Sequence, residues 1–478
     1  MHLVLTQPQT ALREIRARLQ KEKGVILLLV PEVSLVQYFG RELQSFSPVL
    51  VHSGLKKREQ RTVQQAIRES AAHLIIGTRT ALFLPWQKLS QIIVEDPLHE
   101  AYKSDMTPRY AAVDAARELA RIHDALLLFL SPALSTANQY LVDKKVLTLE
   151  DQKPFWPRIT MVDMVQEQLQ GNPSLFSRQA QDIILDAHAD GRTVLLFSPR
   201  RAYTTSVRCQ HCHRAHMCPT CSIPMRLHRT SEDMLICYRC AAYIQVPKQC
   251  TLCHAGTLKP AGLAGSQKIA QVVSDLLDRH GLKHENIPIL DSDLGRVDVN
   301  SQFVVATQMI FGYRYEKSFD QVIVIGADAL AYNPDFRTQE RLIYQLEKIA
   351  DLKPKTLLIQ YWDAQGALMH APDRSWDDFY RQELSDRQTL NWPPFCRLVK
   401  MTYAHRSAAA VGQAARTAVD RLRRAVEYLR IGKTTKILGP TPDHAIILKT
   451  TSDARRLQEL LSYVPTGWTI DIDPRSIT

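Results

Sequence analysis

Eight of the nine cysteines in this chain form four Cys-x-x-Cys pairs within one short stretch, and only Cys396 lies elsewhere. Two residues between ligands let a tight turn present both thiolates to one ion, and two such turns complete a closed tetrahedral site. The spacing therefore predicts two structural zinc ions, with no open coordination position for catalysis. The predicted ligands are Cys209, Cys212, Cys218, Cys221, Cys237, Cys240, Cys250 and Cys253.

Spacing alone does not decide how the four pairs combine. The first and last pairs can share one ion while the middle pairs share the other, or neighbouring pairs can combine. A module this small buries little core, so we expect the metal to supply its folding free energy. The module is either purely structural or also touches DNA through basic and aromatic side chains. These are Arg208, Arg214, Arg226, Arg229, Arg239, Tyr203, Tyr238 and Tyr243.

The composition is that of a globular protein with a basic excess. The 478 residues carry 60 Lys and Arg against 49 Asp and Glu, a formal charge of +11, which favours polyanionic partners such as nucleic acid. The N-terminus has no basic region before its apolar residues, so it does not resemble a signal peptide. No stretch approaches the roughly 18 apolar residues of a membrane span. We therefore expect a soluble, cytoplasmic protein.

Continuous apolar runs alternate with helical patterns along most of the chain, which predicts parallel sheets covered on both faces. Residues 1–145 form one such α/β lobe, 146–176 are a linker containing several prolines, and 177–366 form a second lobe. The cysteine-rich segment 207–256 is inserted into that second lobe. Residues 367–478 are expected to form a C-terminal α+β domain with the ferredoxin-like order βαββαβ.

Short sequence strings stand in a fixed order along both lobes. The first lobe contains PEVSL, HSGL, GTRTALFLP and PRY, and the second contains FSPRRAY, GSQK, TQM, NPDFRTQER and WPPF. With the cysteine pairs, they resemble the PriA (primosomal protein N′) family of replication-restart helicases. The resemblance implies two RecA-like parallel-sheet lobes, with the double-zinc insertion in the second. It also implies that the outer cysteine pairs share one ion.

The family's nucleotide motifs are changed at each position that matches them. In the phosphate-loop stretch, Thr10 and Ala11 replace the Lys and the Mg²⁺-binding hydroxyl, and a cradle of Gly amides is lost. The Asp-Glu-Glu-His motif is represented by Glu95 and Asp96 followed by Pro-Leu. The motif Gly-Ser-Ala-Thr has become residues 128–131, LFLS, and Ile349 and Leu352 stand where the transition-state arginines would be.

Side chains that can bind a nucleic-acid backbone are retained at the positions that match the family's DNA-binding loops. The resemblance assigns DNA contact to the loops containing HSG, GTRT and TQM, and single-strand sensing to an aromatic-rich loop. The residues expected to contact DNA are Arg79, Thr80, Tyr102, Lys103, Arg109, Tyr110, Thr307 and Gln308.

The leading hypothesis is a DNA-binding replication-restart protein without ATPase or helicase activity. It would bind single-stranded or forked DNA and recruit primosome and replication proteins, using two Zn²⁺ but not ATP and Mg²⁺. The chain begins almost at the phosphate-loop position, so we expect an N-terminally shortened relative without the family's N-terminal DNA-binding domains. The alternatives are an active ATP-dependent 3′–5′ DNA helicase with a divergent nucleotide site, and a zinc-dependent protein-interaction scaffold.

Overall fold

A computed structural model describes most of the chain, and the chain divides into two compact units. One unit comprises residues 1–153, 334–340 and 377–478, and the other comprises 154–333 and 341–376. The description leaves out residues 70–71, 153–154, 200–203, 213, 215, 220–224, 229–232, 238–241, 292–298, 331–334, 363–365, 406, 442–443 and 478. Within the described residues, no helix is both long and apolar enough to cross a bilayer.

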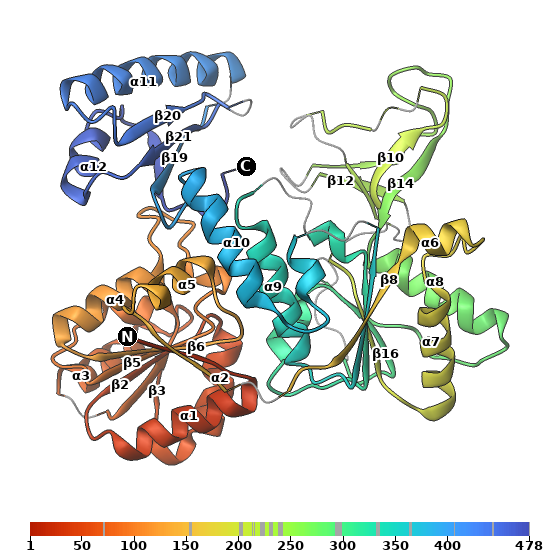
Figure 1. Cartoon of the computed structure of the whole chain (residues 1–478), viewed down its shortest axis with the longest axis horizontal. Coiled ribbons are helices and arrows are strands. Elements are labelled where there is room, and N and C mark those ends of the chain that lie inside the picture. The colour runs from red at the N-terminus through yellow and green to blue at the C-terminus, as the bar shows by residue number, and fades with distance from the viewer. Residues whose placement is uncertain are drawn as a thin grey trace. The chain divides into compact units, whose positions relative to one another are not determined.

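The first unit contains a parallel sheet of seven strands in the order β3-β4-β2-β5-β6-β1-β7 (Figure 1). Strands β2, β4 and β5 are buried along their whole length, which explains why β2, β4 and the centre of β5 are apolar without alternation. The strands are β1 (His2–Leu5), β2 (Ile26–Leu29), β3 (Val49–Val51), β4 (Leu74–Gly77), β5 (Gln91–Glu95), β6 (Leu126–Ser131) and β7 (Thr148–Asp151). The helices are α1 (Pro8–Lys21), α2 (Val33–Glu42), α3 (Lys57–Arg68), α4 (Ala112–His123) and α5 (Thr136–Asp143).

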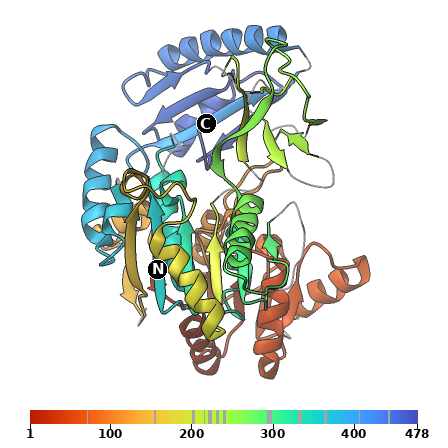
Figure 2. The same ribbon diagram turned by 90° about the vertical axis from the view of Figure 1, so that its right-hand side faces the viewer.

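The second unit contains a parallel sheet of six strands in the order β15-β16-β9-β17-β18-β8. Helices α7 and α8 lie side by side on one face of this sheet (Figure 2), and their apolar residues share a buried cluster with its strands. The strands are β8 (Arg158–Asp163), β9 (Val194–Phe197), β15 (Ile289–Leu290), β16 (Phe303–Ala306), β17 (Gln321–Ile325) and β18 (Thr356–Tyr361). The helices are α6 (Met164–Leu169), α7 (Arg178–Asp190), α8 (Ser266–Arg279) and α9 (Thr338–Ala350).

The cysteine-rich segment forms its own small antiparallel sheet between β9 and α8. Its strand order is β13-β12-β11-β10-β14. The strands are β10 (Thr204–Cys209), β11 (Arg226–His228), β12 (Met234–Ile236), β13 (Tyr243–Gln245) and β14 (Leu258–Ala264). The module is thus an insertion into the second lobe, as expected.

The C-terminal region has the expected βαββαβ order after α10, and α11 and α12 lie on one face of its sheet (Figure 1). The strands of its antiparallel sheet stand in the order β20-β21-β19-β22. The first and third strands of the motif, β19 and β21, are therefore neighbours. The elements are α10 (Trp376–Thr389), β19 (Arg397–Tyr403), α11 (Ala408–Tyr428), β20 (Thr435–Leu438), β21 (Ile446–Thr450), α12 (Ala454–Leu461) and β22 (Trp468–Ile472). Single turns of 3-10 helix occur as η1 (Gln44–Phe46), η2 (Arg79–Phe83), η3 (Glu100–Tyr102), η4 (Gln308–Tyr313), η5 (Ala327–Leu330) and η6 (Gly366–His370).

The fold class expected from the sequence is confirmed: two RecA-like parallel-sheet lobes, an inserted cysteine module and a C-terminal α+β domain. The segment 146–176, expected to be a linker, contains strands of both parallel sheets, because β7 pairs with β1 and β8 pairs with β18. Residues 334–340, expected in the second lobe, cluster with the first unit, as does the C-terminal domain.

Candidate metal centre and nucleic-acid interface

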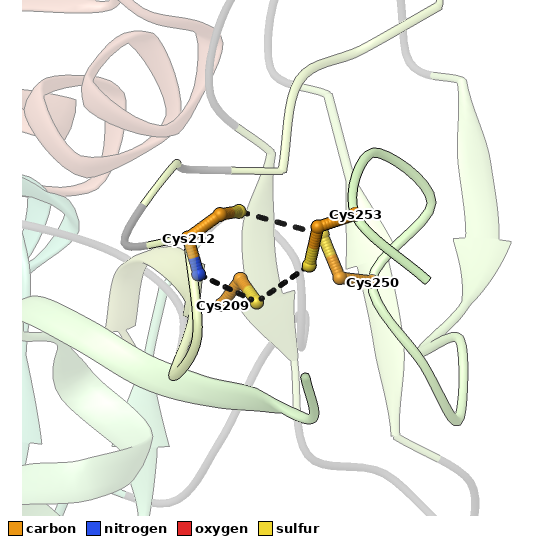
Figure 3. A group of neighbouring side chains, drawn as sticks. All are labelled: Cys209, Cys212, Cys250 and Cys253. Carbon is orange, nitrogen blue, oxygen red and sulfur yellow. Dashed lines mark hydrogen bonds between the residues drawn. The ribbon is translucent and has the colours of Figure 1, made fainter. Parts of the chain in front are cut away.

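Four cysteine sulfurs from the two ends of the inserted module meet at one point (Figure 3). Cys209 ends β10 and Cys212 follows in the next turn, while Cys250 and Cys253 lie in the turn before β14. All four sulfur atoms lie within 4.8 Å of one another. The structure therefore brings the outer pairs together, which is the arrangement implied by the family resemblance.

The spacing of the sulfurs fits a tetrahedral zinc site. Zn–S bonds of about 2.3 Å place the four ligands about 3.8 Å apart along the edges of a tetrahedron. The Sγ atoms of Cys209 and Cys253 are 3.5 Å apart, and those of Cys212 and Cys250 are 3.8 Å apart. Four thiolate donors without an open position suit a structural zinc ion, so these residues can hold the metal.

Backbone amides surround the sulfurs and favour their charged form. The amides of His211 and Cys212 donate to Cys209 Sγ at 3.3 and 3.4 Å, and Leu252 donates to Cys250 Sγ at 3.4 Å. A Cβ atom at Gly256 would lie 2.5 Å from Cys209 Sγ, so only glycine fits beside the cluster.

The pKa values of the thiols diverge because they cannot all be charged side by side without a cation. The amide of Ala255, acting with that of Gly256, lowers the pKa of Cys253 to about 5. At Cys212 the amide of Arg214 lowers the pKa, but burial and the neighbouring sulfurs outweigh it and raise the value to about 11. A divalent cation would allow four thiolates to coexist.

The structure describes one cysteine of each inner pair. Cys218 and Cys237 are both buried in one small apolar cluster with Met225, Leu227 and Leu235. Their partners Cys221 and Cys240 lie outside the described residues. The second zinc ion therefore stays a prediction.

Several basic side chains of the module are exposed. Arg208 and Lys259 stand directly opposite each other on β10 and β14, and Arg214 lies exposed beside the sulfur cluster. Like charges at a cross-strand pair repel, so this position favours an anion. Tyr243 is 71% exposed. Arg226 is half-buried on β11, and Arg229, Arg239, Tyr203 and Tyr238 lie outside the described residues.

The stretch that resembles the family's phosphate loop is a turn from β1 into α1. Gln7 precedes the helix and is buried, and Pro8 occupies the first turn, where it offers no N–H. Thr10 is partly exposed, while the methyl side chain of Ala11 is 2% exposed and packs inward. A phosphate at this turn would meet no cationic side chain from residues 5–12, because that stretch contains none.

The other residues expected to match the family's nucleotide motifs are also packed into the interior. Glu95 and Asp96, at the carboxyl end of β5, are 2% and 0% exposed, so neither carboxylate is presented to a hydrated Mg²⁺. Residues 128–131 lie within β6, and its neighbour β1 carries the phosphate-loop position. Ile349 and Leu352, at the arginine positions, are both fully buried.

Arg79 and Thr80 begin the single turn η2 directly after β4. The guanidinium of Arg79 donates to the carbonyls of Ala101 and Lys103 at 2.8 and 2.9 Å, so it holds the neighbouring loop in place. Thr80 is exposed and lies 3.3 Å, Oγ1 to Oγ1, from Thr78. In the second unit Thr307 and Gln308 occupy the same local position, after β16 and at the start of η4. Thr307 is buried and Gln308 is exposed.

Two residues of the expected aromatic-rich loop point into the protein. Tyr102 is 2% exposed, and its hydroxyl lies 2.7 Å from the carbonyl of Glu95. Lys103 is 7% exposed, and its ammonium donates to the Ile472 carbonyl at 2.6 Å. It also approaches Asp471 Oδ1 at 2.8 Å, as an ion pair without hydrogen-bond geometry. Base stacking on Tyr102 would require this segment to move.

The other two residues of that loop are partly exposed. Arg109 Nη1 lies 3.6 Å from Asp471 Oδ2, and Tyr110 packs edge-to-face against Phe83 with ring centroids 5.0 Å apart. Burial raises the pKa of Tyr110, although the charge of Arg79 lowers it. Phe83 is 65% exposed. Sequence reasoning did not select Phe83, although a large aromatic residue in the loop after an apolar strand was a usable signal.

Comparisons with known proteins agree with the resemblance. No protein-family model matches the chain. The replication restart protein PriA of Bacillus subtilis (strain 168) is 27% identical over 478 residues, which covers 95% of this chain and 57% of that protein. PriA of Synechocystis sp. is 28% identical over 89% of this chain and 54% of its own length, and PriA of Helicobacter pylori (strain 26695) is 28% identical over 82% and 64%.

The chain is a relative of the PriA family. It spans a little over half the length of the PriA proteins it matches, 57%, 54% and 54% for three of them. Among solved structures, it is similar to the DUF1998 helicase MrfA bound to DNA, with a TM-score of 0.44 and 10% identity over 80% of this chain and 48% of that chain. For RecG bound to a three-way DNA junction, the TM-score is 0.40 and the identity is 11%, over 81% of this chain and 43% of that chain.

Proposed function

We propose that this PriA relative is a DNA-binding replication-restart protein that neither hydrolyses ATP nor unwinds DNA. The observation that carries the proposal is the β1–α1 turn, where Gln7, Pro8 and Ala11 leave a triphosphate without a cation, a full ring of amides or a Mg²⁺-binding hydroxyl. Phosphoryl transfer depends almost entirely on such positioning and charge stabilisation. The buried Ile349 and Leu352 provide neither.

DNA binding is proposed at the carboxyl edge of the first sheet. Exposed Phe83 and partly exposed Tyr110 form an aromatic pair there, which suits stacking with bases of single-stranded DNA. Thr80 offers an exposed hydroxyl for a phosphate, and Arg79 acts by holding the loop that carries Tyr110. Thr307 and Gln308 would contact the backbone from the second lobe, and Lys103 and Tyr102 would contribute only if their loop opens.

Titration calorimetry with a non-hydrolysable ATP analogue and Mg²⁺, followed by an ATPase assay with single-stranded DNA, tests the first half of the proposal. We expect no heat of binding and no turnover above the buffer. DNA-stimulated turnover that is abolished by Asp96→Asn would overturn it and favour a helicase with a divergent site.

Gel-shift titration with single-stranded and forked DNA tests the second half. Since each stacked base contributes about 1–3 kcal/mol, Phe83→Ala with Tyr110→Ala should weaken single-strand binding by roughly 5- to 150-fold or more. The matched control is Tyr428→Ala, which removes a tyrosine that is 77% exposed on α11. Equal losses in the two variants, or no shift of any DNA by the unaltered protein, would contradict the proposal.

Two zinc ions are proposed for the module, held by the outer and the inner cysteine pairs. Native mass spectrometry gives the stoichiometry directly, and a single bound ion would contradict the inner site.

The proposed partners are primosome and replication proteins of the cytoplasm, because the relatives are named as replication restart proteins. Pull-down after nuclease treatment distinguishes protein contacts from those bridged by DNA.

A further inference from the structure

Helix α3 carries a row of cations on the surface of the first unit. The helix is KREQRTVQQAIR, residues Lys57–Arg68, and only Val63 and Ile67 are buried. Its side chains Lys57, Arg58, Arg61 and Arg68 are exposed, as is Lys56 at the preceding position. At 3.6 residues per turn, Lys57, Arg61 and Arg68 lie within about 40° of one another around the helix, away from the buried Val63 and Ile67.

None of these five cations forms an ion pair with a residue that the structure describes. The two acids of the segment have other partners, since Glu59 accepts from the Lys56 amide at 2.6 Å and Glu69 accepts from Gln65 Nε2 at 2.9 Å. On α4, by contrast, the arginines pair with acids three residues away, Arg117 with Asp114 and Arg121 with Glu118.

The unpaired cations repel one another along the helix. Lys57 and Arg61 are four residues apart, and Arg58 and Arg61 are three apart, so each pair meets on the helix surface. Like charges at these spacings destabilise a helix, and no neighbouring carboxylate relieves them in the described part of the chain. An anionic partner along this face would remove the repulsion.

The length and chemistry of the row indicate which polyanion fits. Lys57 and Arg68 are 11 positions apart, which is about 16 Å along the axis, and one strand of a duplex presents about five phosphates over that distance. The exposed residues of α3 include no aromatic side chain. Sites for single-stranded nucleic acid combine basic side chains with aromatic ones that stack on the bases, whereas duplex DNA offers its phosphates in a regular row to Lys and Arg alone.

We propose that α3 binds the phosphodiester backbone of duplex DNA, through Lys57, Arg61 and Arg68. The site lies on the helix that packs against the edge strand β3, and the loop at 52–56 joins that strand to it. It shares no residue with the Phe83–Tyr110 pair proposed for single strands. The inference rests on the proposed DNA-binding function and adds the duplex arm of a branched DNA as a ligand.

The test is a salt titration of duplex and single-stranded affinity for the triple variant Lys57→Gln, Arg61→Gln, Arg68→Gln. Losing three phosphate contacts lowers the slope of log K against log salt by about 2.7, so duplex affinity should fall on the order of 10²-fold near 0.1 M salt. Single-stranded affinity should stay within about twofold. The charge-retaining variant Lys57→Arg, Arg61→Lys, Arg68→Lys should bind duplex like the unaltered protein.

The matched control removes three exposed arginines from α11, as Arg416→Gln, Arg421→Gln, Arg424→Gln. An equal loss of duplex affinity in the control would show an effect of net charge and overturn the assignment to α3. Two results for the α3 variant would also overturn it: an equal loss of single-stranded affinity, or an unchanged duplex affinity. Circular dichroism and melting temperature confirm that each variant is folded. If the unaltered protein binds no DNA, the proposed function itself fails, whereas normal binding with an unaffected α3 variant defeats only this inference.

Discussion

Arg387 joins three parts of the first unit that are far apart in the sequence. It lies on α10 and is 3% exposed. Its Nε lies 2.7 Å from Glu383 Oε1, and its Nη2 lies 3.4 Å from Glu340 Oε2 and donates to the Phe336 carbonyl at 2.9 Å. Glu340 in turn accepts from the Thr136 amide at the start of α5, at 2.9 Å. One guanidinium thus connects α10, the 334–340 segment and the first lobe.

Replacing Arg387 by Met should destabilise the first unit by about 3 kcal/mol. Removing one partner of a buried ion pair costs about 3–5 kcal/mol because the other charge stays buried. The lower figure applies because the Glu340 and Glu383 side chains retain 14% and 18% exposure, which lets water screen them. Met keeps the length of the stem that packs over the Phe336 ring, 5.3 Å from guanidinium carbon to ring centroid in the unaltered protein.

The loss should also depend on pH. Burial raises the pKa of Glu383, the charge of Arg387 lowers it, and Glu340 raises it further. Without Arg387 the pKa rises more, so the folded state favours the protonated carboxyl more strongly. A carboxyl with a raised pKa costs stability as pH rises above its unfolded value, so Arg387→Met should be more damaging at about pH 7.5 than at about pH 5.

Urea unfolding monitored by hydrogen exchange of α5 and α10 measures this loss unit by unit. The control is Arg381→Met on the same helix, whose side chain is 78% exposed and pairs with Asp378. That surface pair should contribute no more than about 0.5 kcal/mol. A loss below about 1 kcal/mol in Arg387→Met, or a loss equal at both pH values, would refute the reasoning.

Two further predictions concern the metal and the C-terminal strand. Removing zinc with a chelator, or replacing Cys250 by Ser, should abolish hydrogen-exchange protection in β10 and β14 but leave α7 and α8 protected. The reason is that the module has only a small apolar cluster of its own. Unchanged protection in β10 would contradict this prediction. Asp471→Asn should cost about 1–3 kcal/mol and speed exchange in β22, because the buried Lys103 ammonium loses its carboxylate at 2.8 Å; exchange as slow as in the unaltered protein would count against that role.

The sequence by itself determined the kinds of element and the chemistry of the metal site. Runs such as ILLL at 26–29 are apolar at every position, and only a strand buried on both faces tolerates that pattern, so the parallel sheets followed directly. Paired cysteines at fixed spacing predict metal ligands because the two thiolates of one turn can reach one ion. The absence of cations and glycines from residues 5–12, which resemble the family's phosphate loop, is likewise a matter of residue type and requires no coordinates.

Only the tertiary structure decided which distant residues meet. Spacing left the pairing of the cysteines open, because any two turns can close a tetrahedron, and the fold brought Cys209 to 3.5 Å from Cys253. Lys103 was expected to contact DNA because it matches the family's aromatic-rich loop, yet the fold places its ammonium 2.6 Å from a carbonyl of β22, some 370 residues away. Local sequence records the charge of such a side chain, whereas its partner is set by packing across the whole unit.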